Sequence, residues 1–162
     1  MRDMDILVVL EMDSSSAEEV IRKLGKLLEE KGYVKDTFVQ ATIEREKSVP
    51  TGLELAGGVN AALPHAGVEH VNKPALAVAR LKRPVTFRRM DDPDSEVSVR
   101  MVFMPAIKDP SSYIQTLMKL VDVFKDSGVM ESLMKARTEQ EVEQVLRERL
   151  STREEEDPQE SY

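Results

Sequence analysis

The 162-residue chain contains no cysteine, and its only histidines are His65 and His70. Without cysteine it can form no disulfide, thiolate nucleophile or zinc–thiolate site. A membrane-spanning helix needs about 20 consecutive apolar residues, and no stretch of this sequence approaches that length. The N-terminal stretch MRDMDILVVLEMD places acidic residues inside what would be a signal core. A secretory signal is therefore not expected, and a cytoplasmic location is predicted.

Basic residues are fewer than acidic ones. The chain has 23 Lys and Arg residues against 30 Asp and Glu residues, which gives a formal net charge of -7. This balance argues against DNA or RNA as the main partner, because proteins that bind nucleic acids present basic surfaces. An acidic surface suits docking to a basic patch on another protein.

The apolar pattern predicts strands in the middle of the chain, with helices on either side of them in the sequence. We expect a first strand over 5–11, helices over 14–32 and 35–48, strands over 58–65, 74–82, 84–90 and 96–107, and helices over 111–126, 128–137 and 138–150. This order predicts the α/β class, with a mixed β-sheet flanked by helices in a three-layer α/β/α sandwich. Residues 1–150 are expected to form one domain. The charged tail 151–162 lacks an apolar face and is expected to be disordered.

His65 lies in the segment GVNAALPHAGVEH, at the end of an expected strand. A neutral imidazole nitrogen is a nucleophile that can accept an acyl or phosphoryl group. Pro64 restricts the backbone before the histidine, and Ala66 and Gly67 leave room for the surface of a partner. Spacing alone also fits, and by itself favours, a half-buried histidine in a turn.

No metal or cofactor site is predicted. The two histidines are five residues apart, with Glu69 between them, and that spacing is poor for metal ligation on a helix or a strand. His70 is expected to be a loop residue that faces solvent. The glycines of ELAGGVN are not followed by the lysine and serine of a P-loop, so they are expected to form a turn between strands.

The segment EREKSVPTG contains a possible phosphate ligand, Arg45, near the end of an expected helix. The planar guanidinium of arginine suits phosphate oxygens, and the hydroxyl of Thr51 can add a further contact. The alternative is that Arg45 is an exposed helical charge that pairs with Glu44, Glu46 or Asp36.

Taken in order, EREKSVPTG, GGVNAALPHAGVEHVNKPALAVARLKRPVTF, VRMVFMPAI and a helix that begins SSYIQTLMKL, followed by TEQEVEQVL, resemble a known family. The segments are similar to a type-2 enzyme IIA domain, the fructose/mannitol/galactitol/nitrogen class of the phosphoenolpyruvate-dependent sugar phosphotransferase system (PTS). The resemblance covers about residues 5–150, and the PTG triplet leans towards the galactitol-like subgroup.

The resemblance implies a cytoplasmic phosphocarrier. His65 matches the family histidine that takes a phosphoryl group from the phosphocarrier protein HPr on Nε2, while a backbone hydrogen bond holds Nδ1. The group then passes to an enzyme IIB partner, usually onto a cysteine, and serves sugar uptake through the membrane enzyme IIC. Arg45 is expected to stabilise the phosphoryl group in transit, and Thr51 to hydrogen-bond it. The alternative is a regulatory module of the nitrogen type, in which the same phosphohistidine controls partner proteins.

One position departs from the family pattern. Many members carry a second active-site histidine at the head of the helix after the last strand, where this chain has Tyr113. Tyrosine can donate a hydrogen bond but cannot become cationic, so Tyr113 is either a neutral substitute or a packing residue. HPr is expected to dock on exposed apolar residues around Ala62, Leu63 and Ala66, because transient interfaces have an apolar centre.

Overall fold

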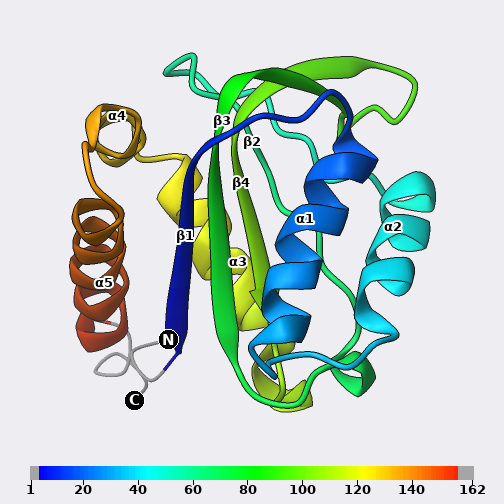
Figure 1. The fold of residues 1–162 in the computed structure, drawn as a ribbon. Helices are drawn as coiled ribbons and strands as arrows, with labels where there is room; N and C mark the ends of the chain where they lie inside the picture. Colours follow the sequence, from blue (N-terminus) through cyan, green and yellow to red (C-terminus); the bar gives the residue numbers. More distant parts are fainter. Residues whose placement is uncertain (1–3, 157–162) are drawn as a thin grey trace.

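A four-stranded mixed sheet forms the middle layer of the computed structural model, which describes residues 4–156 (Figure 1). Its strands are β1 (Asp5–Met12), β2 (Ala61–Ala62), β3 (Ala75–Arg88) and β4 (Glu96–Ala106), in the order β1-β3-β4-β2. β1 is parallel to β3 and β2 is parallel to β4, whereas β3 and β4 are antiparallel.

Helices cover both faces of this sheet. α1 (Ala17–Glu30) and α2 (Phe38–Ser48) lie on one face, and α3 (Tyr113–Phe124), α4 (Ser127–Lys135) and α5 (Glu139–Glu156) lie on the other (Figure 1). Two short 3-10 helices, η1 (Val68–His70) and η2 (Pro110–Ser112), complete the elements. The predicted three-layer α/β/α sandwich is confirmed.

Alternation along β3 produces two separate core layers. Ala77 and Ala79 pack in the cluster beneath α1 and α2, while Leu76 and Val78 pack in the cluster beneath α3, α4 and α5. Successive side chains of a strand point to opposite faces of the sheet, so a central strand covered by helices on both sides must be apolar at every position. The run ALAVARL meets this requirement except at Arg80.

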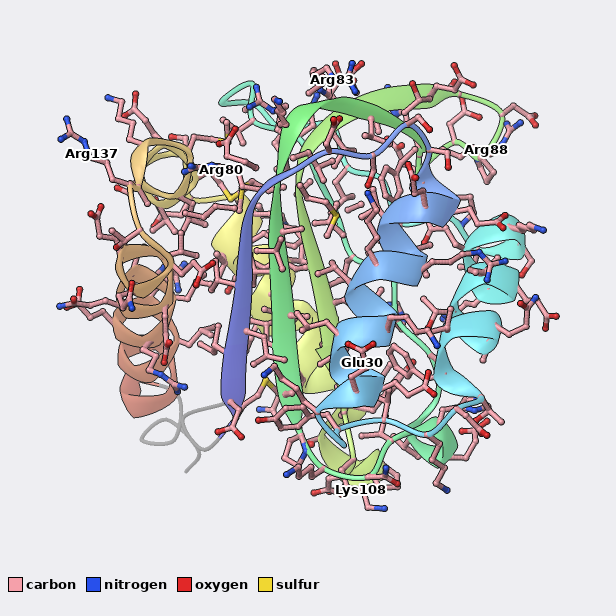
Figure 2. The ribbon with its side chains drawn as sticks, viewed as in Figure 1. Glu30, Arg80, Arg83, Arg88, Lys108 and Arg137 are labelled. Atoms are coloured by element: carbon pink, nitrogen blue, oxygen red, sulfur yellow. The ribbon has the colours of Figure 1, made fainter. Side chains whose placement is uncertain are left out.

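Arg80 links the sheet to the second helical layer. Its side chain is 9% exposed and extends from β3 towards α4 (Figure 2). Nη1 donates to the carbonyl oxygens of Leu133, Met134 and Ala136 at 3.0, 3.2 and 2.7 Å, and Nη2 donates to Glu11 Oε1 at 3.3 Å. The buried guanidinium therefore supplies donors to the carbonyls at the end of α4, which have no partner within the helix.

Three predicted boundaries are wrong. The strands expected over 74–82 and 84–90 are one strand, β3. The pairing with β4 shifts register between Arg80 and Val85, so Pro84 is not part of a paired position and its missing N–H removes no hydrogen bond of the sheet. The strand expected over 58–65 is reduced to Ala61–Ala62, and the chain then leaves the sheet. The last helix does not end at residue 150 but continues to Glu156; the rest of the predicted tail, 157–162, lies outside the described residues.

Candidate functional site

His65 lies in the irregular segment that joins β2 to η1. The side chain is 6% exposed, and its Nδ1 lies 2.7 Å from the carbonyl oxygen of Leu63. A carbonyl oxygen can only accept a hydrogen bond, so Nδ1 carries the ring proton. The other nitrogen, Nε2, is therefore left with a free lone pair and is the nucleophilic atom of the ring.

The surroundings of His65 keep its ring uncharged. Burial lowers the pKa of the imidazole below its ordinary value of 6.5, and the positive charge of Arg45 lowers it further, against the opposing effect of the Leu63 hydrogen bond. Desolvation disfavours the charged form of a buried base, and a nearby like charge does the same. The ring is consequently neutral at neutral pH, as a nitrogen nucleophile must be.

Nε2 is buried, and no atom within residues 4–156 hydrogen-bonds to it. Buried polar atoms are nearly always hydrogen-bonded. An unpaired nucleophilic nitrogen therefore indicates a functional atom rather than a structural one. The ring of Tyr113 lies beside it, with the two ring centroids 6.0 Å apart and the planes at 65°.

Tyr113, the first residue of α3, donates from Oη to the carbonyl oxygen of Ala66 at 3.4 Å. Its pKa is raised above 10.0, chiefly by burial, while the charge of Arg45 opposes the shift. The phenol is thus neutral, and its one hydrogen bond is long. Tyr113 thus lies next to His65 as a neutral aromatic ring.

Arg45 is exposed on α2, and its charge affects the pKa of both His65 and Tyr113. The structure thus places Tyr113 beside His65 and Arg45 within electrostatic range of both. Within residues 4–156 no hydrogen bond or ion pair joins the Arg45 guanidinium to another residue, although its charge opposes the rise in the pKa of neighbouring Glu46.

Thr51 is connected to the imidazole through the Leu63 peptide rather than by a direct hydrogen bond. The residue is 2% exposed, and its hydroxyl donates to Glu46 Oε1 at 2.9 Å and accepts from the backbone N–H of Leu63 at 3.0 Å. Both functions of the hydroxyl are in use. A direct hydrogen bond from Thr51 to a phosphoryl group on His65 would require the bond to Glu46 to break.

Glu46 is a site residue that sequence reasoning treated only as an ion-pair partner for Arg45. Its carboxylate also accepts the backbone N–H of Thr51 at 2.9 Å. Burial raises the pKa of the Glu46 carboxyl above 4.5, and the hydrogen bonds from Thr51 oppose that shift. The five-residue separation in EKSVPT was the available signal, but it becomes a contact only because α2 ends at Ser48 and the chain turns back.

The expected docking surface around Ala62, Leu63 and Ala66 is wrong. These residues are 0%, 1% and 3% exposed, because Ala62 and Ala66 pack in the core cluster beneath α1 and α2, and Leu63 packs in the cluster on the other face. The large apolar residues that do face solvent include Ile114 and Met118 of α3, at 63% and 65% exposed. They are about one helical turn apart, and Ile114 follows directly after Tyr113.

His70 does not join His65. It lies in η1, where Nδ1 is 2.8 Å from Thr37 Oγ1 and Nε2 is 3.6 Å from Glu69 Oε2. Its side chain is 23% exposed, so it faces solvent less than expected. Residues 4–156 hold no group of three or more His, Asp or Glu side chains arranged for a metal ion. No helix among them is long and apolar enough to cross a membrane.

Comparison with known proteins places the chain in a family. Residues 5–149 match the family described as "Phosphoenolpyruvate-dependent sugar phosphotransferase system, EIIA 2". The chain is 31% identical over 116 residues to the galactitol-specific EIIA component of Escherichia coli K12, covering 72% of this chain and 76% of that protein. It is also 31% identical over 144 residues to the fructose-specific EIIA component of Haloferax volcanii, covering 88% and 90%. A solved complex of enzyme IIAMTL with phosphorylated enzyme IIBMTL from Escherichia coli matches with a TM-score of 0.70 and 29% identity, covering 86% of this chain and 92% of that one.

Proposed function

Because the chain belongs to the type-2 enzyme IIA family of the phosphoenolpyruvate-dependent sugar phosphotransferase system, we propose that His65 is its phosphorylated residue. In this proposal His65 accepts a phosphoryl group from HPr and passes it to an enzyme IIB partner in the cytoplasm, in support of sugar uptake. The observation that carries the proposal is the state of the imidazole. Nδ1 is held by the Leu63 carbonyl at 2.7 Å, and Nε2 is neutral and unpaired.

The transfer step follows from that geometry. The Nε2 lone pair attacks the phosphorus atom in line with the bond to the HPr histidine. That bond breaks as the new bond from phosphorus to Nε2 forms, and its electron pair leaves with the HPr imidazole. No proton has to move on His65, because the proton stays on Nδ1. The Leu63 carbonyl accepts a stronger hydrogen bond as the ring gains positive character.

Arg45 supplies the charge that this reaction requires. Catalysis of phosphoryl transfer consists mainly of positioning and of stabilising charge on the phosphoryl oxygens. The free guanidinium donors of Arg45 lie close enough to His65 to shift its pKa, and guanidinium is the preferred partner for phosphate. Arg45 therefore binds the incoming oxygens, while Tyr113, which is neutral, adds no charge.

Nε2 must be uncovered for the reaction to occur. Tyr113 is the partly exposed ring beside it, and it is held by a hydrogen bond of only 3.4 Å. Movement of this side chain as the partner docks opens the path to Nε2. Exposed Ile114 and Met118 on the same helix give the partner an apolar surface to bind next to that path.

The test is phosphorylation in a reconstituted system. Incubation with phosphoenolpyruvate, enzyme I and HPr should add one phosphoryl group that is labile in acid and stable in base, and His65→Ala should abolish it. His70→Ala is the matched control and should be labelled as the wild type is. Labelling of His65→Ala at the wild-type level would refute the assignment. Transfer of the label onto an enzyme IIB protein separates the transport role from regulation, because a purely regulatory module would retain it.

A further inference from the structure

The partly buried carboxylate of Glu46 lies two hydrogen bonds from the peptide that orients His65. Glu46 Oε1 accepts the hydroxyl hydrogen of Thr51 at 2.9 Å, and Glu46 Oε2 accepts the backbone N–H of Thr51 at 2.9 Å. An ionised carboxylate is an acceptor only, so it fixes where the hydroxyl hydrogen of Thr51 points. With that hydrogen directed at Glu46, a lone pair of Oγ1 is left to face Leu63.

Leu63 connects this pair to the imidazole. Its backbone N–H donates to Thr51 Oγ1 at 3.0 Å, and its carbonyl oxygen accepts from His65 Nδ1 at 2.7 Å. No ladder bond of the sheet involves Leu63, because β2 ends at Ala62. Thr51 thus replaces the missing strand partner at the residue whose carbonyl selects the ring tautomer.

We infer that Glu46 and Thr51 are positioning residues for phosphoryl transfer, which rests on the proposed function of His65. Together they hold the Leu63 peptide, and the Leu63 carbonyl holds the proton on Nδ1 so that Nε2 stays the nucleophile. This differs from a role as a direct phosphoryl ligand, since the Thr51 hydroxyl is directed away to Glu46. It also differs from simple closure of the turn after α2, which would leave the imidazole unaffected.

Variants of Thr51 separate these roles. Thr51→Val keeps the shape and removes the hydroxyl, so the Leu63 N–H loses its acceptor. Because a misplacement of about 1 Å can cost about 100-fold in rate, kcat for transfer from phospho-HPr should fall about 10- to 100-fold. The KM for HPr should change less than about threefold, since the docking surface is intact. Thr51→Ser restores the hydroxyl and should return kcat to within about threefold of the wild type.

The carboxylate is tested on the same helix. Glu46→Gln leaves one acceptor oxygen where two donors from Thr51 require acceptors, so it should lower kcat by an intermediate amount, about 3- to 30-fold. Glu44→Gln is the matched control, because Glu44 is exposed on α2 and bonds Gln40. It should leave kcat unchanged.

The decisive readout is the tautomer of His65, measured in the unphosphorylated protein from its imidazole 15N chemical shifts. The wild type and Thr51→Ser should show the proton on Nδ1, whereas Thr51→Val should show a mixture with the proton on Nε2. A folded Thr51→Val protein with the wild-type tautomer and the wild-type kcat would overturn the inference. If Thr51→Val does not fold, the same comparison in Glu46→Gln decides, and a wild-type tautomer and kcat there would overturn it. Failure of the wild type to accept a phosphoryl group would refute the proposed function, while the tautomer comparison would still test the positioning.

Discussion

Because the imidazole of His65 is buried, the protein should become less stable as the pH falls. The ring is 6% exposed, and burial followed by the charge of Arg45 holds the pKa of its folded form below 6.5. In the unfolded chain the same histidine has the ordinary pKa of about 6.5. As the pH falls through that value, the unfolded chain binds a proton that the folded protein does not. Acid therefore favours the unfolded state, until the pH reaches the lower pKa of the folded ring.

The size of this effect follows from linkage. A difference of one bound proton changes the free energy of unfolding by about 1.4 kcal/mol per pH unit. The wild type should lose stability relative to His65→Gln as the pH falls below about 6.5, with a slope of at most this value, while the difference between the two proteins should be constant above about pH 7.5.

Urea unfolding at a series of pH values between about 7.5 and 5.5 measures this difference. Subtracting the His65→Gln curve removes the contributions of the carboxylates, which both proteins share. His70→Gln keeps His65 and should keep the acid-side loss of stability. Parallel curves for the wild type and His65→Gln would refute the reasoning, because they would mean that the folded ring binds its proton as readily as the unfolded one.

Three further results are expected. Arg80→Met should lower the free energy of unfolding by about 2–4 kcal/mol, because three carbonyls at the end of α4 lose a buried charged donor. The control Arg83→Met, at an exposed arginine, should lower it by less than about 0.5 kcal/mol. Equal urea midpoints for the two variants would contradict this. Arg45→Gln should reduce kcat for phosphoryl transfer about 10- to 100-fold without loss of stability, and an unchanged rate would remove Arg45 from the site. Met118→Glu should raise the KM for HPr several-fold and leave kcat nearly unchanged, while Met90→Glu, at another exposed apolar position, should alter neither; equal effects of the two would argue against docking on α3.

The fold class and most of the helices and strands could be predicted from the sequence. Strand-like runs between amphipathic helices were enough for the three-layer sandwich. The resemblance pointed to His65, Arg45 and Tyr113. In the structure Tyr113 lies beside His65 and Arg45 is within electrostatic range of both, although the three come from the segment after β2, α2 and α3. The local apolar pattern predicted the helices and strands, whereas the family resemblance predicted which side chains lie near one another.

The burial of the site could not be predicted in the same way. His65 is covered because α3, which begins 48 residues later in the chain, packs beside it (113 − 65 = 48). No pattern within GVNAALPHAGVEH records that contact. The same is true of Glu46, which becomes a partner of Thr51 only through the turn after α2. Pro84 by itself predicts a strand boundary, and the register shift that accommodates it within β3 depends on pairing with β4, which the local sequence does not reveal.

The measurement that tests the central claim most directly is the position of the phosphorus atom in the phosphorylated protein. Two-dimensional correlation of 15N-labelled histidine with 31P, after incubation with phosphoenolpyruvate, enzyme I and HPr, reports which nitrogen carries the phosphoryl group. The structure predicts one phosphoryl group per chain, bonded to Nε2 of His65, with the proton still on Nδ1. Phosphorus on Nδ1 of His65, on His70, or on no histidine at all would contradict the account.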